Sequence, residues 1–363
     1  MSSQITAELK KPSELSPAER EAWQEFTDHN STLTSPYFRL EFADAMEVAR
    51  TDTRVIVARR SGELLGFLPL QLGKVGYARP LGGPLGDVQG LIQPGGAQAD
   101  PRDWLRASGV PLFEFQSAVG VDQKWRDYGR TQDGSWVCDL SGGFEAYEAH
   151  RQLLSPSAFK NIRSRTRRLE KVEEGFEFCL QDERLDVFDT MIEWKRQQYH
   201  RTQVFDVFSV GWTKTLLEAI LKTQTDRFRG TCSTLRIGGK IAAVHIGMAS
   251  EALTHYWFPA YDPEFNRISP GLLLLIEMIK DAAERGHTGL ELGPGEYRFK
   301  LELGSYQVPL WQGCMMTRSA PAVLRGVSQV LAGACEKAPL GKIGSLPRRA
   351  LRKADKLAAF YAW

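Results

Sequence analysis

The sequence predicts an α+β protein made of two related halves, each with a mixed sheet flanked by helices, followed by a C-terminal helical tail. Three observations predict this fold class. A chain of 363 residues, of which 42% are hydrophobic, is long enough to bury two cores. A strand, glycine turn, strand pattern occurs once in each half, and the second half continues as strand, helix, strand. We place the halves at residues 1–150 and 151–319 and the tail at residues 320–363.

Each hairpin pattern joins two β-prone runs through glycine. The first covers residues 55–70 and turns at Gly62, and the second covers residues 234–246 and turns at a Gly-Gly pair. Helical stretches are expected before them, at residues 37–48 and 216–221. The two halves therefore resemble a duplicated α+β unit.

A basic amphipathic helix is expected at residues 157–175. Phe159, Ile162 and Leu169 recur at helical spacing, and Gly175 provides a stop. The other faces are rich in lysine and arginine. Two interpretations stay open: the cations bind a phosphate-rich ligand, or they form the solvated face of a helix between domains. The basic residues are Lys160, Arg163, Arg165, Arg167, Arg168 and Lys171.

The second half continues with a strand at residues 252–261, a loop at residues 262–268 and a long helix. Ser269 is a suitable N-cap and Pro270 suits the first helical position. Residues 272–283 carry the apolar face, and a glycine soon after them can end the helix. The pattern predicts a well-defined helix start directly after the loop.

Two further strands are expected at residues 290–293 and 309–316, with a Gly-flanked loop between them. The loop carries Lys300. The resulting order is strand, strand, strand, helix, strand, loop, strand.

The stretch Leu-Glu-Leu-Gly-Pro-Gly-Glu-Tyr-Arg-Phe-Lys-Leu-Glu-Leu-Gly at residues 290–304 resembles a signature of the CelD-like exopolysaccharide acetyltransferases. It is more loosely similar to the lysine-bearing segment of the Fem peptidoglycan aminoacyltransferases. The resemblance extends from about residue 35 to residue 316, and it implies two GNAT-like halves. Four further family-like pieces stand in the family's order, at residues 35–38, 81–87, 157–170 and 269–271.

The resemblance implies transfer of acetyl, or another short acyl group, from acetyl-CoA or another acyl-CoA to an amino sugar or saccharide. The acceptor would be a precursor in the biosynthesis of cellulose or another exopolysaccharide, a capsule or a holdfast-type polymer. It implies that Lys300 offers a point charge to a phosphate or a developing oxyanion. Glu291 and Glu296 flank Lys300 and are the candidate bases toward an acceptor amine, and Asp87 is the candidate for binding a sugar or amine. The alternative for Lys300 is a surface lysine with a buried stem.

In GNAT enzymes the N-terminus of the helix after a central strand binds the coenzyme A pyrophosphate, because free N–H groups and the helix dipole favour an anion. The corresponding residues here are Arg267, Ser269 and Gly271, although Pro270 removes one N–H. A plain Ser-Pro helix start is the alternative.

Aromatic and histidine side chains near these segments are further candidates. Tyr256, Trp257 and Tyr297 could line a sugar or pantetheine groove, or the two strand aromatics could serve packing alone. His245 lies in an apolar run, which favours a histidine held within the sheet over a general base. No residues have metal-ligand spacing, so no metal is expected.

The tail is basic and ends in aromatic residues. Arg348, Arg349 and Arg352 precede Phe360 and Trp363. Three interpretations stay open: a terminal helix docked on the core, a contact with a membrane surface, and a regulatory site for an anion such as cyclic di-GMP.

Composition and charge argue against several classes of protein. A formal net charge of +2 does not indicate stable nucleic-acid binding. The five cysteines are scattered and never form a CxxC pair, so neither a disulfide framework nor a structural zinc site is expected. The first residues lack the apolar core of a signal peptide, and the longest apolar run, at residues 272–276, is too short for a bilayer. We expect a cytoplasmic protein with peripheral contact to the inner membrane or a polysaccharide synthase as an open alternative.

Two other functions stay open. One is a Fem-like transferase that uses aminoacyl-tRNA, which the duplicated layout and the basic helix favour. The other is a catalytically inactive GNAT-fold effector that binds a nucleotide signal through the basic tail.

Overall fold

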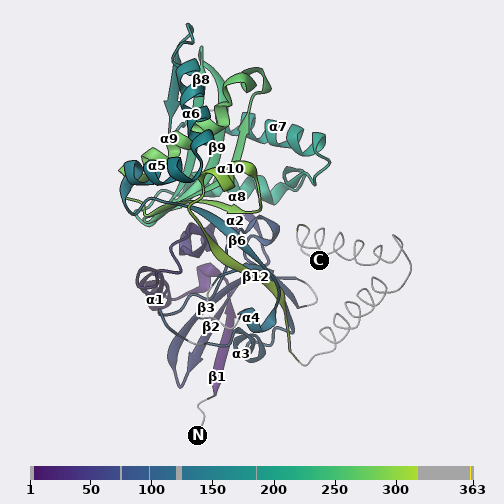
Figure 1. Ribbon diagram of the computed structural model, residues 1–363. Coiled ribbons are helices and arrows are strands. Elements are labelled where there is room, and N and C mark those ends of the chain that lie inside the picture. Colours follow the sequence, from purple (N-terminus) through teal and green to yellow (C-terminus); the bar gives the residue numbers. More distant parts are fainter. Residues whose placement is uncertain are drawn as a thin grey trace, which may run out of the picture. The chain divides into compact units, whose positions relative to one another are not determined.

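The structure is a computed structural model in which the chain divides into two compact units. The first unit consists of Met1–Leu33, Met46–Asp133 and Pro309–Trp363, and the second of Thr34–Ala45 and Gly134–Val308. Figure 1 shows the helices and strands of both units. The structure describes residues 4–73, 76–97, 99–119, 125–184, 186–317 and 360, and the side chains of residues 130–132 lie outside this description.

The first unit is built on a mixed sheet with the strand order β1-β2-β3-β4-β5-β12. Its first strands are antiparallel neighbours, and the predicted hairpin is confirmed as β2 and β3. Ser61 and Gly62 turn it with positive φ angles of 51° and 88°. Buried Trp104, Phe113 and Trp125 fill the core of this unit. The strands are β1 (Ile5–Lys10), β2 (Thr53–Arg60), β3 (Glu63–Leu72), β4 (Tyr77–Pro80), β5 (Leu112–Ala118) and β12 (Tyr306–Met316, from Pro309 onward in this unit).

Short helices complete the first unit. Helix α1 begins with a capping box, in which Ser16 accepts from the Glu19 amide and Glu19 accepts from the Ser16 amide. The helices are α1 (Pro17–Asp28), the end of α2 (Leu40–Ala49, from Met46 onward in this unit), α3 (Pro101–Ala107) and α4 (Trp125–Tyr128).

The second unit has the strand order β6-β11-β10-β9-β8-β7. All neighbouring strands are antiparallel except β10 and β11, which are parallel. The predicted second hairpin is confirmed as β8 and β9. The strands are β6 (Gly129–Asp139, from Gly134 onward in this unit), β7 (Phe176–Cys179), β8 (Phe228–Ile237), β9 (Lys240–Ser250), β10 (Leu253–Tyr261) and β11 (Gly289–Pro294).

Helices cover this sheet on both sides (Figure 1). Helices α5, α6 and α9 pack together and against a core that includes Phe159, Ile276 and Leu290. Helix α7 packs on β9 and β10, and α8 packs on β8. The helices are α5 (Gly143–Leu154), α6 (Pro156–Leu169), α7 (Asp186–Arg201), α8 (Gly211–Lys222), α9 (Pro270–Glu284) and α10 (Arg298–Leu303).

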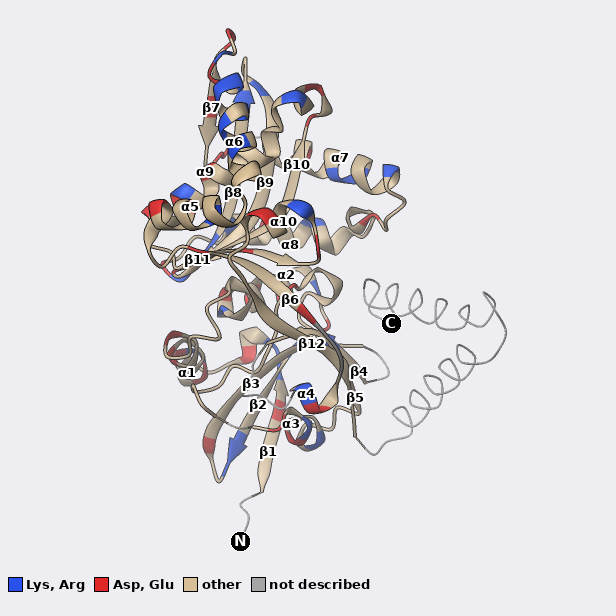
Figure 2. Cartoon of the chain, in the orientation of Figure 1, with Lys and Arg blue, Asp and Glu red and all other residues tan. Residues whose placement is uncertain are grey.

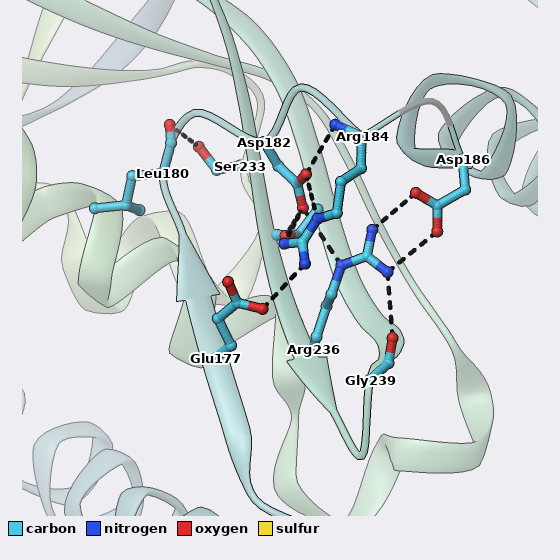
Figure 3. Close-up of polar contacts among 9 residues, drawn as sticks. Glu177, Leu180, Asp182, Arg184, Asp186, Ser233, Arg236 and Gly239 are labelled. Atoms are coloured by element: carbon cyan, nitrogen blue, oxygen red, sulfur yellow. Dashed lines mark hydrogen bonds and ion pairs between the residues drawn. The ribbon is translucent and has the colours of Figure 1, made fainter.

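An ion-pair network fixes the start of α7 on the sheet (Figure 3). The Arg236 guanidinium on β8 donates to both carboxylate oxygens of Asp186, at 2.9 and 3.1 Å, and to the Gly239 carbonyl oxygen at 3.2 Å. Asp182 is buried and accepts from Arg184 at 2.7 Å and from Thr234 at 2.5 Å. Burial alone would raise the pKa of Asp182, but these donors lower it well below its usual range. The network therefore holds a carboxylate at neutral pH and orients α7.

Two helix predictions are confirmed. The basic helix is α6, with Phe159, Ile162 and Leu169 buried as the spacing requires. It ends at Leu169, before Gly175. The long apolar helix is α9, which starts at Pro270 as expected and ends next to Gly286 with its positive φ of 79°.

Two local predictions near α9 were wrong. The expected loop at residues 262–268 contains a 3₁₀ helix, η5 (Pro263–Ile268), which Asp262 caps. Ser269 ends that helix in the left-handed region (φ 53°, ψ 63°), so its hydroxyl does not cap α9. A residue whose side chain caps a helix N-terminus has an extended backbone, whereas the end of η5 holds Ser269 in the left-handed conformation.

Candidate active site at the parting of two parallel strands

Strands β10 and β11 separate partway along their length. They pair at Leu253 with Gly289, Thr254 with Leu290, and His255 with Glu291. Within their described residues no pairing follows, although β10 continues to Tyr261 and β11 to Pro294. The register of both strands with their outer neighbours also shifts directly beyond the last pair. The separation leaves strand edges with which an extended ligand can pair.

A buried polar network stands at the point of separation. The Glu291 carboxylate accepts from the hydroxyls of Ser35 (3.0 Å) and Ser135 (2.8 Å), and His255 Nδ1 lies 3.1 Å from it. Burial would raise the pKa of Glu291, but the hydrogen bond and charge of His255 and the serine hydroxyls lower it. Glu291 is therefore a carboxylate. On the other side of the ring, His255 Nε2 lies 3.3 Å from the Tyr37 hydroxyl.

This network explains the Ser-Pro-Tyr-Phe segment at residues 35–38. Ser35 and Tyr37 both belong to it, and the Tyr37 ring packs edge-on against His255 and Trp257. Segment Thr34–Ala45 is consequently part of the second unit, although it precedes most of the first unit in sequence.

Lys300 lies close to the end of β11. The sequence placed it in a loop, but it belongs to α10, whose N-cap is Tyr297. Only 7% of Lys300 is exposed, and its Nζ donates to the Pro294 carbonyl oxygen at 2.7 Å. The rings of Tyr297 and Phe299 lie 5.4 and 6.0 Å from the ammonium. The helix turns the side chain inward, which the flanking glycines did not reveal.

The other predicted catalytic and substrate residues lie in different settings. Glu296 and Tyr297 are exposed between β11 and α10, and Trp257 is half-buried on β10. Tyr256 is buried and stacks on His245 with 4.7 Å between ring centroids. Asp87 belongs to the first unit, whereas the rest belong to the second.

The start of α9 offers a partial phosphate site. Pro270 has no N–H, and the amides of Leu272 and Leu273 both donate to the Ser269 carbonyl oxygen. Gly271 therefore contributes the main backbone donor of the first turn. The exposed guanidinium groups of Arg168 and Arg267 add positive charge there. Arg168 of α6 lies close to Arg267, since it donates to the Arg267 carbonyl oxygen at 3.4 Å. In Figure 2 the blue of lysine and arginine residues recurs along α6.

His245 is a neutral histidine held in the sheet, as the apolar run predicts. It is fully buried, and its Nε2 accepts from the Trp257 amide at 3.0 Å. Burial and the positive charges of His255 and Lys195 lower its pKa to about 3. A group with that pKa does not act as a general base at neutral pH.

Lys195 is a buried cation that the sequence analysis did not single out. It lies on α7 with 8% exposure, and burial lowers the pKa of its ammonium to about 8. A signal was present: Met191 and Ile192 are buried, and Lys195 occupies the same stripe of the helix. A lysine at an apolar helical position marks either a buried stem or a functional cation.

Comparison with known proteins gives the same class of fold. Residues 156–301 match the family model of the acetyltransferase (GNAT) domain. The structure of FemX is similar with a TM-score of 0.52 and 10% identity, covering 87% of this chain and 99% of that one. A tandem GNAT protein from the clavulanic acid biosynthesis pathway gives a TM-score of 0.51 and 9% identity, covering 86% and 98%. No curated protein sequence matches this chain.

The chain therefore has a tandem GNAT, Fem-like fold. The match of residues 156–301 to the GNAT acetyltransferase domain supports an acyltransferase. A GNAT domain implies an acyl-CoA donor and an acceptor substrate. Among the described residues, no helix combines the length and apolar composition that crossing a bilayer requires. Arg348, Arg349 and Arg352 lie outside the described residues.

Proposed function

We propose that the protein transfers an acetyl or other short acyl group from acyl-CoA to an amino sugar or saccharide that is a precursor of an exopolysaccharide, cellulose, capsule or holdfast-type polymer. The observation that carries the proposal is the lysine-bearing segment at residues 290–304, which resembles the CelD-like signature and forms β11 and α10 beside the strand gap. The gap supports a donor with an extended amide chain, since pantetheine can pair with free strand edges.

The proposed chemistry needs few groups. The acceptor amine or hydroxyl attacks the thioester carbonyl, its proton leaves to a base, and the coenzyme A thiolate departs. Lys300 places a positive charge beside the end of β11, where it can stabilise the developing oxyanion. Glu296, exposed next to α10, is the candidate base. Arg267, Arg168 and Gly271 would attract the donor's phosphates.

Calorimetric titration with acetyl-CoA and other short-chain acyl-CoA thioesters tests the donor. Release of the coenzyme A thiol in the presence of a panel of amino sugars then tests the acceptor. We expect binding of at least one thioester and thiol release that depends on an amino sugar. The proposal fails if no thioester binds.

A second candidate function is aminoacyl transfer from charged tRNA. The FemX-like fold and the exposed cations of α6 favour it. At low salt, where electrostatic binding is strongest, charged tRNA should then alter the protein's electrophoretic mobility. Unchanged mobility removes this candidate.

The inactive-effector alternative predicts no turnover and binding of cyclic di-GMP that depends on Arg348, Arg349 and Arg352. Turnover by purified protein removes it. Contact with the inner membrane or a polysaccharide synthase through the same tail stays a prediction, which vesicle sedimentation of the intact chain can test.

A further inference from the structure

The two units repeat one arrangement of strands, including a pair of parallel strands. In the second unit, hairpin β8–β9 is followed by β10, α9 and β11, and β10 pairs in parallel with β11. In the first unit, hairpin β2–β3 is followed by β4, α3 and β5, and β4 pairs in parallel with β5. The place between β4 and β5 therefore corresponds to the gap between β10 and β11.

Strand β4 leaves its sheet early. It pairs with β5 at Tyr77 and Ala78 and ends at Pro80, where the chain departs toward the 3₁₀ helix η3 (Gly83–Leu85). In the second unit β10 stays paired with β9 as far as Tyr261. Strands β3 and β5 both run on past the end of β4, which by itself would leave a gap between them.

The protein's own backbone, at residues 88–92, fills that gap. The Gln89 amide donates to the Ser117 carbonyl oxygen at 3.0 Å, and the Gln89 carbonyl oxygen accepts from the Val119 amide at 2.8 Å. These bonds make Gln89 a parallel partner of Ala118, the last residue of β5. The segment thus pairs with a strand edge in the way that we propose for an extended donor in the second unit.

The same segment is joined to β3 on its other side. Ile92 and Phe67 exchange two backbone hydrogen bonds of 2.8 Å each, in an antiparallel pair. A Cβ at Gly66, which has a φ of 149°, would collide with the Ile92 carbonyl oxygen, so glycine permits this close approach. Val88, Leu91 and Ile92 are buried. A ligand that entered here would have to break four backbone hydrogen bonds and expose these apolar side chains.

The start of the helix is also occupied in the first unit. Helix α3 lies between β4 and β5 in the chain, as α9 lies between β10 and β11. At the start of α9, Gly271 offers an amide to the donor's phosphates. At the start of α3, the Asp100 carboxylate accepts from the Arg102 amide and from the Tyr128 hydroxyl, each at 2.9 Å. A helix start that already holds a carboxylate of its own chain repels a second anion.

We infer that each chain binds one acyl donor, in the second unit, and that residues 88–92 and Asp100 are internal substitutes for a donor in the first unit. The inference rests on the proposed function, since it takes the gap between β10 and β11 and the start of α9 as the donor's site. The first unit keeps the same arrangement of strands, but its own chain occupies both places that a donor would need.

Calorimetric titration of the intact chain with acetyl-CoA measures the number of bound donors. We expect one molecule per chain. The double variant Arg168→Ala/Arg267→Ala should weaken this binding by about tenfold or more, as expected for losing charge-assisted contacts with phosphate. Arg106→Ala is the matched control, because it removes an exposed arginine of α3, and it should keep both the number and the affinity. Two molecules per chain, or weakening by Arg106→Ala and not by the double variant, overturns the inference.

Hydrogen exchange tests the internal strand without any ligand. A peptide that covers residues 88–92 should exchange slowly in the free protein, because its amides donate within the sheet. Acetyl-CoA should leave this exchange unchanged. Fast exchange in the free protein, or exchange that changes when acetyl-CoA is added, would show that the segment does not keep the place closed, and it overturns the inference.

The inference and the proposed function fail in different ways. Failure of every thioester to bind contradicts the proposed function, whereas two bound thioesters leave that function standing and contradict the single donor site. The exchange measurement needs no ligand, so it decides on the internal strand in either case.

Discussion

Replacing Glu291 with leucine tests the network at the parting strands. The carboxylate accepts from Ser35, Ser135 and His255. Leucine leaves all three donors without this acceptor, and the serine hydroxyls can turn elsewhere more easily than the His255 ring. An unsatisfied buried donor costs about 1–3 kcal/mol. We therefore expect Glu291→Leu to lower the free energy of unfolding of the second unit by about 3–5 kcal/mol, the range found when a buried charged pair is broken.

Glu291→Gln is the matched comparison. Its amide oxygen can accept from His255 and Ser35, and its NH₂ group can donate to Ser135, so it should cost about 1 kcal/mol, the net value of one hydrogen bond. Scanning calorimetry resolves the difference, because 1 kcal/mol shifts melting by roughly 2–4 °C in a unit of this size. Glu173→Gln, at an exposed position, should leave melting unchanged. Equal melting of the Leu and Gln variants would refute the role of Glu291 as the acceptor of this network.

The pH dependence has a defined sign. Because the pKa of Glu291 is lowered in the folded protein, its ionisation contributes stability above the unfolded value of about 4.3. That contribution is lost as the pH falls through the folded value. The stability gap between wild type and Glu291→Gln should therefore be full at pH 7 and shrink under acid. A gap that widens toward low pH would contradict the assignment of Glu291 as a carboxylate.

Three further predictions concern the donor site, catalysis and the anchoring of α7. Arg168→Ala and Arg267→Ala should each weaken acetyl-CoA binding, as measured by calorimetric titration. If these residues contact exposed phosphates, the loss of affinity should disappear in high salt. Unchanged affinity at low salt would remove these residues from the site. Lys300→Met should lower turnover by about 10²-fold, the size expected for losing one electrostatic stabiliser, and Lys300→Arg should restore activity only in part; full turnover of Lys300→Met would move the active site elsewhere. Asp182→Asn should lower the free energy of unfolding by about 3 kcal/mol at pH 7, because it breaks a buried ion pair. Urea unfolding at several pH values should show this loss shrinking as the pH drops below about 4. A loss that does not change with pH would show that the charge of Asp182 does not matter.

Local patterns predicted the regular elements of the second unit well. The spacing of Phe159, Ile162 and Leu169 fixes which side of α6 is buried, and the apolar run of α9 fixes its length. The glycine turns likewise predicted where both hairpins reverse direction. Each of these signals lies within a few residues of the structure it specifies.

The remaining features depend on contacts between distant residues. Ser35 and Glu291 are 256 positions apart, so no local pattern reveals their hydrogen bond. The burial of Lys300 follows from α10 turning it toward the Pro294 carbonyl oxygen. Lys195 carried a visible signal in the apolar stripe of α7, but the extent of its burial emerges only in three dimensions.

The central claim is that the gap between β10 and β11 binds the acyl donor. Hydrogen exchange of the backbone amides, measured by mass spectrometry with and without acetyl-CoA, tests it most directly. The account predicts slower exchange in residues 256–261 of β10 and at the start of α9 around Gly271, with little change in the strands of the first unit. Acetyl-CoA binding that protects other segments and leaves these two unchanged would contradict it.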